Sequence, residues 1–108
     1  MSPVTDALVV LVTTPTPERA AEIARAVVEE RLAACGNVLP GIRSIYRWEG
    51  KVEDEGEALL VLKTTRARFD ALRERVLDLH PYQVPEVVAL AIDAGSAPYL
   101  AWLAAETR

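Results

Sequence analysis

Three short stretches of the sequence are apolar almost without interruption, and polar or turn-forming residues bound each of them. They cover residues 7–13, 58–62 and 87–92, and they are rich in valine, leucine and isoleucine. Runs of this length are typical of strands that are buried on both faces, because a strand with one wet face alternates polar and apolar residues. The sequence therefore predicts three strands that are apolar on both faces.

A helix is predicted for residues 17–32, where apolar residues recur every three or four positions. Thr16 suits the N-cap, and Pro17 suits the first helical position because its missing amide hydrogen is not needed there. The apolar side consists of Ala20, Ile23, Ala24, Val27 and Val28. This is an amphipathic helix of about four turns.

A second helix is predicted for residues 66–79, with Thr64 or Thr65 as its cap. It ends at His80-Pro81, since the residue before a proline resists helical angles. The stripe that we expect to face the core consists of Phe69, Leu72, Val76 and Leu79.

A long β-hairpin is predicted between these helices. Residues 42–48 are rich in strand-forming types, Glu49-Gly50 supplies a turn, and residues 58–62 form the returning strand. A bulge or bend is expected early in the hairpin, at Asn37, Pro40 and Gly41. The acidic residues of the tip are interpreted as a solvated turn, with a weak cation site as the alternative: Glu49, Glu53, Asp54, Glu55 and Glu57.

The predicted order of elements is β-α-β-β-α-β, followed by a short helix over residues 97–105. In that last helix Leu100 and Leu103 point inward, with Trp102 beside them. This order is typical of an α+β, ferredoxin-like sandwich, in which one four-stranded sheet carries both main helices on one face. Right-handed crossovers place the first and third strands in the centre. Residues 1–108 are predicted to form a single domain.

The sheet face opposite the two main helices has no predicted cover, although the strands are apolar on that side too. Exposed apolar area of this extent usually marks a contact surface, and open strand edges invite pairing with another copy. The sequence therefore predicts a closed homo-oligomer whose open sheet faces pack together.

Composition narrows the possible partners. The 108 residues carry a net charge of −4 without a basic cluster, which argues against nucleic acid as a partner. The apolar runs are too short to span a membrane, and the first six residues do not resemble a signal peptide. Cys35 is the only cysteine, so no intrachain disulfide can form. The prediction is a cytoplasmic protein without nucleic-acid or membrane partners.

Few residues are candidates for chemistry. The sequence has no GxSxG, P-loop, HExxH or CxxC motif, so we expect no enzyme activity. Cys35, between Ala34 and Gly36, is interpreted as a buried small hydrophobe rather than a nucleophile.

The segment from His80 to Glu86 carries the strongest candidates for metal ligands. An imidazole and a carboxylate lie six residues apart, with prolines that stiffen the chain between them. The simpler interpretation is that His80 satisfies the last carbonyls of the preceding helix and that Glu86 pairs with an arginine. A metal site needs three or four ligands, which an oligomer interface could gather from neighbouring chains.

A second candidate site is a cleft between subunits. The side chains that could line it are Tyr46, Trp48, Lys63 and Tyr82. Tyrosine and tryptophan prefer half-buried positions at interfaces. Packing of these aromatic residues within the hairpin or between subunits is the simpler interpretation, and the residue types favour it.

Five motifs in this order resemble the CutA divalent-cation tolerance proteins. They are LAACGNVLPG (32–41), SIYRWEGK (44–51), LKTT (62–65), HPYQVPE (80–86) and YLAWL (99–103). Together they extend over most of the chain. The resemblance implies a ferredoxin-like homotrimer with an architecture similar to the PII signal proteins. It also implies a role in tolerance of divalent metals, with copper as the most prominent ligand.

The chain departs from some of these relatives at two positions. Val12 stands where some members proposed to bind copper carry a cysteine, and Leu79 stands where some carry an additional histidine. Only His80 and Glu86 carry over as metal ligands. Three functions follow as hypotheses. The first is a trimeric, non-catalytic tolerance protein that binds copper or another divalent cation. The others are a PII-like module that binds a small molecule between subunits, with Lys63 and the hairpin arginines as anchors, and a rigid trimer that presents its acidic hairpin tips to another protein.

Overall fold

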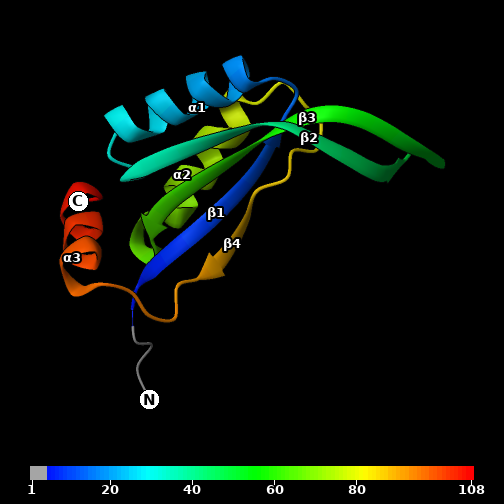
Figure 1. Cartoon of the computed structure of the whole chain (residues 1–108). Helices are drawn as coiled ribbons and strands as arrows, with labels where there is room; N and C mark the ends of the chain where they lie inside the picture. Colours follow the sequence, from blue (N-terminus) through cyan, green and yellow to red (C-terminus); the bar gives the residue numbers. More distant parts are fainter. Residues whose placement is uncertain (1–4) are drawn as a thin grey trace.

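A four-stranded antiparallel sheet carries α1 and α2 on one face, and α3 lies at one end of it (Figure 1). The structure is a computed structural model that describes residues 5–108. Met1–Val4, part of the segment predicted to lack a signal peptide, lie outside the described residues. The elements are β1 (Ala7–Thr14), α1 (Pro17–Glu29), β2 (Cys35–Trp48), β3 (Lys51–Thr65), α2 (Arg66–Leu79), β4 (Val88–Ala91) and α3 (Ala97–Glu106).

The order of the strands in the sheet is β2-β3-β1-β4, and all neighbouring pairs are antiparallel. The prediction that the first and third strands are central is confirmed. The longest helix has 14 residues, and in the part of the chain that the structure describes no helix is long and apolar enough to cross a bilayer.

Helix α1 begins as predicted and ends earlier than predicted. The hydroxyl of Thr16 accepts a hydrogen bond from the Arg19 amide at 3.1 Å, which caps the helix. The prediction that the helix continues to Leu32 is wrong, because Arg31 takes a left-handed conformation with φ 61°. The amide of Leu32 then bonds back to the Val27 carbonyl at 2.9 Å, so the chain turns toward β2.

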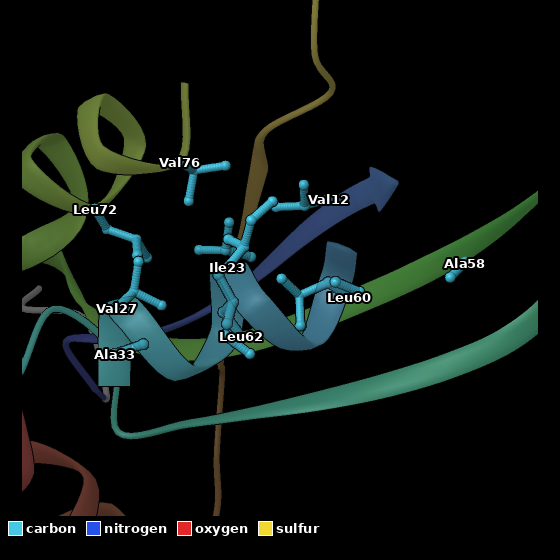
Figure 2. Packing of buried hydrophobic residues seen from close by; sticks show 12 residues of the cluster. Val12, Ile23, Val27, Ala33, Ala58, Leu60, Leu62, Leu72 and Val76 are labelled. Atoms are coloured by element: carbon cyan, nitrogen blue, oxygen red, sulfur yellow. The ribbon is translucent and has the colours of Figure 1, made fainter. Parts of the chain in front are cut away.

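The main core lies between the sheet and helices α1 and α2 (Figure 2). Val12 of β1 and Leu62 of β3 are fully buried against Ile23 and Val27 of α1. From α2, Leu72 and Val76 are fully buried, while Phe69 and Leu79 pack at the edge of the core, which confirms the predicted stripe. Gly36 lets α1 approach closely, because an added Cβ would lie 2.9 Å from the Cβ of Ala24.

The hairpin of β2 and β3 is longer and more continuous than predicted, and its far end extends beyond the helices (Figure 1). Strand pairing continues to Trp48 and Lys51, where Glu49 and Gly50 form the turn with φ angles of 49° and 81°. Positive φ at both central residues is the geometry of a tight hairpin turn. The predicted bulge is confirmed by a register shift between Leu39 and Ile42.

Strands β1 and β4 differ from the prediction in burial. In β1, Val10 and Val12 are fully buried, whereas Val9 and Leu11 on the other face are only partly buried. Strand β4 is a four-residue edge strand and exposed throughout, rather than a buried six-residue strand. On this side of the sheet, α3 covers only the end near Ala7 and Ile92, and no helix of the described residues covers the rest. Ala89 and Ala91 lie on the helix side by register and are exposed because β4 is the edge strand.

We call the uncovered side of the sheet the open face. Directly paired residues of antiparallel strands point to the same side, so the register places on it the apolar residues Val9, Leu11, Leu39, Leu59, Val61, Val88 and Leu90. Val88 and Leu90 are about half exposed, at 46% and 56%. Beyond the end that α3 covers, the open face is therefore an apolar surface that the described residues leave without a helix over it.

Candidate functional site

A recess lies where the hairpin leaves the sheet, and we call it the base cleft. Its hairpin wall consists of Tyr46, Trp48 and Glu57, which point to the open-face side of the hairpin by their register. Its other wall is the segment between α2 and β4, with Tyr82, Val84 and Glu86. This segment passes beside the base of the hairpin in Figure 1. The recess comprises two adjoining cavities of about 350 and 560 Å³, and Tyr46, Trp48, Tyr82 and Val84 line both.

His80 anchors the segment between α2 and β4, which forms the outer wall of the base cleft, to the sheet. Its Nε2 lies 2.7 Å from the Thr13 carbonyl oxygen, and its Nδ1 accepts a hydrogen bond from the Tyr82 amide at 3.2 Å. Because Nδ1 accepts, Nε2 carries the proton and donates to Thr13. The imidazole is buried, with 8% of its surface exposed. His80 therefore ties the chain after α2 to β1 and positions Tyr82.

Tyr82 closes the cleft against Glu57. The phenol donates a hydrogen bond of 2.6 Å to Glu57 Oε2, and Glu57 is buried, at 8% exposed. Burial raises the pKa of the Tyr82 phenol above its ordinary value, and the hydrogen bond and charge of Glu57 raise it further. The same tyrosine ring packs against His80, with 4.7 Å between the ring centroids.

Negative charge surrounds the aromatic residues of the cleft. Partial desolvation raises the pKa of Tyr46, and the negative charges of Glu55, Glu57 and Glu53 raise it further. Glu86 lines the larger cavity together with Glu57, and among residues 5–108 Arg47 is the one positively charged residue that lines it. The cleft is therefore aromatic and predominantly acidic.

The predicted metal ligands lie close to the cleft, and the structure places them in different surroundings. Glu86 is exposed and lines the larger cavity, while both ring nitrogens of His80 bond to main-chain groups. Within residues 5–108 no group of three or more His, Cys, Asp or Glu side chains converges in a way that could hold a metal ion. In a single chain, Glu57 and Glu86 are the carboxylates that a cation entering the larger cavity would meet.

Tyr46, Trp48 and Tyr82, three of the four residues predicted for a cleft, are brought together. Lys63 lies elsewhere, six residues along β3 from Glu57, which is about 20 Å in a strand. Its ammonium donates a hydrogen bond to Asn37 Oδ1 on the neighbouring strand. The positive anchor expected from Lys63 is therefore not part of the base cleft in a single chain.

Two sequence interpretations need correction. Cys35 is only partly buried, with its sulfur 3.6 Å from the Tyr99 hydroxyl, so it is not the enclosed small hydrophobe that its neighbours suggest. The sequence groups Glu57 with the solvated acidic tip, yet the side chain is buried because Tyr82 covers it. One signal is present, since Glu57 directly precedes the apolar run of β3 and so lies at the sheet rather than at the tip.

The element order and strand order define an α+β domain of the ferredoxin-like type, with an uncovered sheet face and a recess beside it. The family described as "CutA1 divalent ion tolerance protein" matches residues 8–106, nearly the whole chain. The chain belongs to this family. The resemblance seen in the five sequence motifs is thereby confirmed.

Similar proteins support the assignment in sequence and in structure. A divalent-cation tolerance protein CutA of Thermus thermophilus is 57% identical, over 92% of this chain and 96% of its own length. A solved structure of a divalent cation tolerance protein from the same species superimposes with a TM-score of 0.92 at 55% identity, covering 94% of this chain and 99% of that one. A chloroplastic CutA of Arabidopsis thaliana is 48% identical over 94% of this chain, which spans only 56% of that longer protein.

Proposed function

We propose that this chain is a non-catalytic divalent-cation tolerance protein that works as a homotrimer in the cytoplasm, with the base cleft as its cation- or ligand-binding region. The single observation that carries the assembly is the open face. Seven apolar side chains on the four strands are left partly or largely exposed, because no helix of the described residues lies over them. Exposed apolar surfaces of this kind are characteristic of contacts between copies.

A matched pair of substitutions tests the assembly. Leu90→Glu places a charge on the open face, whereas Leu77→Glu places the same charge on the outer side of α2; these leucines are 56% and 44% exposed. We expect Leu90→Glu to reduce the mass measured by light scattering to that of one chain, because burying an unpaired carboxylate is unfavourable. Leu77→Glu should keep the mass of the wild type. A wild-type protein that is monomeric at micromolar concentration would contradict the proposal.

For the metal site we propose Glu86, with His80 as a conditional second ligand. Support for Glu86 comes from its exposed position on the larger cavity, beside Glu57. His80 could coordinate a metal only by giving up one of its two main-chain hydrogen bonds. A site with so few ligands from one chain binds weakly unless neighbouring chains add more.

Copper titration by calorimetry tests this site. We expect Glu86→Gln and His80→Ala each to weaken copper binding, with the larger loss for Glu86→Gln, because it removes a ligand that already faces the cavity. Glu74→Gln is the matched control, since Glu74 is an exposed carboxylate on α2. Copper binding that is the same in the wild type and in both site variants would rule the site out.

A PII-like signalling module is the second candidate, and one specific observation favours it. The base cleft has aromatic walls and the volume of a small-molecule site. Stabilisation of the protein by a ligand, measured as a rise in the unfolding midpoint, would support this function. Of the anchors expected from the sequence, Lys63 lies away from the cleft in a single chain, whereas Arg47 of the hairpin lines the larger cavity.

A further inference from the structure

The walls of the base cleft suit a different kind of ligand from a bare metal ion. Tyr46, Trp48 and Tyr82 line both cavities, with Val84 between them. Aromatic ring faces supply no preferred ligand atoms for a metal ion such as copper, because copper prefers nitrogen, oxygen or sulfur donors. They attract organic cations strongly, because the ring quadrupole favours a positive charge over the ring face while the apolar body of the ligand is buried.

The charges around the cleft point to the same class of ligand. Glu57 and Glu86 line the larger cavity, and the Glu57 side chain is more than nine-tenths buried. The hydrogen bond from Tyr82 occupies only Oε2 of Glu57. Among the described residues Oε1 accepts no hydrogen bond, so it is available to an N–H donor. Glu53 and Glu55 add to the negative charge near Tyr46. The positive charge of Arg47, which lines the larger cavity, offsets part of it.

We propose that the base cleft binds a small organic ammonium ion, which pairs with the carboxylate of Glu57 and stacks its alkyl groups against Tyr82 and Tyr46, with Trp48 lining the same cavity farther along the hairpin. This inference rests on the proposed role of the cleft as a binding region and specifies its ligand. His80 contributes indirectly, because it fixes the backbone of Tyr82 and so holds the outer wall in place.

Butylammonium, 1-butanol and butyrate form a matched set of probes, since they share the alkyl chain and differ in charge. The titration is followed by the fluorescence of Trp48 in a Trp102→Phe background, because Trp48 and Trp102 are the two tryptophans of the chain. Trp102 lies on α3, away from the cleft residues. We expect butylammonium to bind about tenfold or more tightly than 1-butanol, as a hydrogen bond to a charged group implies. Butyrate should not bind.

Three variants locate the ligand. Glu57→Gln keeps the size of the side chain and an acceptor for Tyr82, and it should weaken butylammonium binding about tenfold. Glu74→Gln is the matched control and should bind as the parent protein does. In case Glu57→Gln fails to fold, which circular dichroism will show, Tyr46→Leu gives a second test at an exposed position. It should weaken butylammonium binding and leave the fold intact.

Each outcome separates this inference from the proposed function. Equal binding of butylammonium and 1-butanol would overturn the inference, as would preferred binding of butyrate. Failure of all three probes to bind, while copper binding still depends on Glu86, would overturn it and leave the proposed metal site standing. Butylammonium binding that depends on Glu57 would support the inference. If copper binding at the same time does not change in the Glu86 and His80 variants, the proposed metal site is ruled out.

Discussion

The two faces of the sheet are built from similar residues and have different surroundings. On β3, Leu60 and Leu62 are fully buried under α1 and α2, whereas Leu59 and Val61, which alternate with them, are only partly buried on the open face. Alternation along a strand sends neighbours to opposite sides. The apolar residues of β3 are therefore buried by α1 and α2 on one face and only partly buried on the other, where no helix of the described residues lies over them.

The chain covers one part of the open face with its own residues and leaves another part exposed. Along β1 and β4 it is apolar and uncovered. At the base of the hairpin the segment after α2 crosses it, and Tyr82 buries Glu57 there. The chain thus covers a carboxylate with its own loop and leaves valines and leucines of the same face exposed. The proposed assembly and the proposed ligand binding would therefore use neighbouring parts of one surface.

The largest expected effect is a difference in the free energy of unfolding lost on substitution at the two faces of β3. We expect Leu62→Ala to lower the free energy of unfolding by about 2–5 kcal/mol, because it opens a cavity in a closed core. Leu59→Ala should cost less than about 1 kcal/mol in the dissociated chain. Urea unfolding at several protein concentrations measures both values. The Leu59→Ala loss should increase where the wild type is assembled, because association stabilises the folded state.

Equal losses for the two variants at every protein concentration would break the comparison. They would mean that Leu59 is packed as fully as Leu62, so that the two faces of β3 do not differ in how they bury apolar residues. A Leu62→Ala loss that depends on concentration, with none for Leu59→Ala, would mean that the helix-covered side forms the contact between copies.

Sequence patterns are sufficient for the fold because periodicity reports which residues favour burial. The helices, the strand order and the bulge before Ile42 all follow from the spacing of apolar residues and from turn chemistry. Periodicity does not report what covers a strand. The run at residues 87–92 therefore predicts a buried strand, whereas β4 is exposed in a single chain.

The candidate site is predictable only in part, for a different physical reason. Tyr46, Trp48 and Tyr82 can be grouped by residue type. The burial of Glu57 depends on a contact with Tyr82, 25 positions away, and on the loop path that His80 fixes. Such contacts arise from tertiary geometry and leave no local pattern. For Lys63 the residue type is misleading. Its charge suggests an anchor in the cleft, but its position on β3 places it beside Asn37, to which it donates a hydrogen bond.

An intermediate effect is expected where the chain covers its own open face. Tyr82→Phe removes the hydrogen bond to Glu57 and should cost roughly 1.5 kcal/mol of stability at pH 7, the lower range for a bond to a charged group. The phenol in the unfolded chain ionises near pH 10, while its pKa in the folded chain is raised, mainly by burial and then by Glu57. The bond's contribution is therefore complete below about pH 10 and is lost as the pH rises above it.

Alkaline unfolding of both proteins checks this sign. The wild type should lose stability above about pH 10, and Tyr82→Phe should lose less over the same range, so that the two curves converge. Phenolate absorbance gives an independent measurement, because folded Tyr82 should ionise later than free tyrosine. Parallel curves, or ionisation of all three tyrosines at the ordinary pKa, would show that Tyr82 does not close the cleft.

The smallest effect is expected on the hairpin arm, beyond both faces. Arg43 donates two hydrogen bonds, of 2.8 and 2.6 Å, to the carboxylate of Asp54, and both side chains are exposed. The bond to Arg43 holds the pKa of Asp54 below its ordinary value, so its stabilising effect is present above about pH 4 and is lost as the pH falls through the lowered pKa. Solvent screens such pairs, so Arg43→Ala should leave the unfolding midpoint nearly unchanged and should raise the pKa of Asp54 toward normal in an NMR titration. A large loss of stability would instead mean that the arm is buried in the assembled protein, and the surface shared between copies would then extend from the open face along the hairpin.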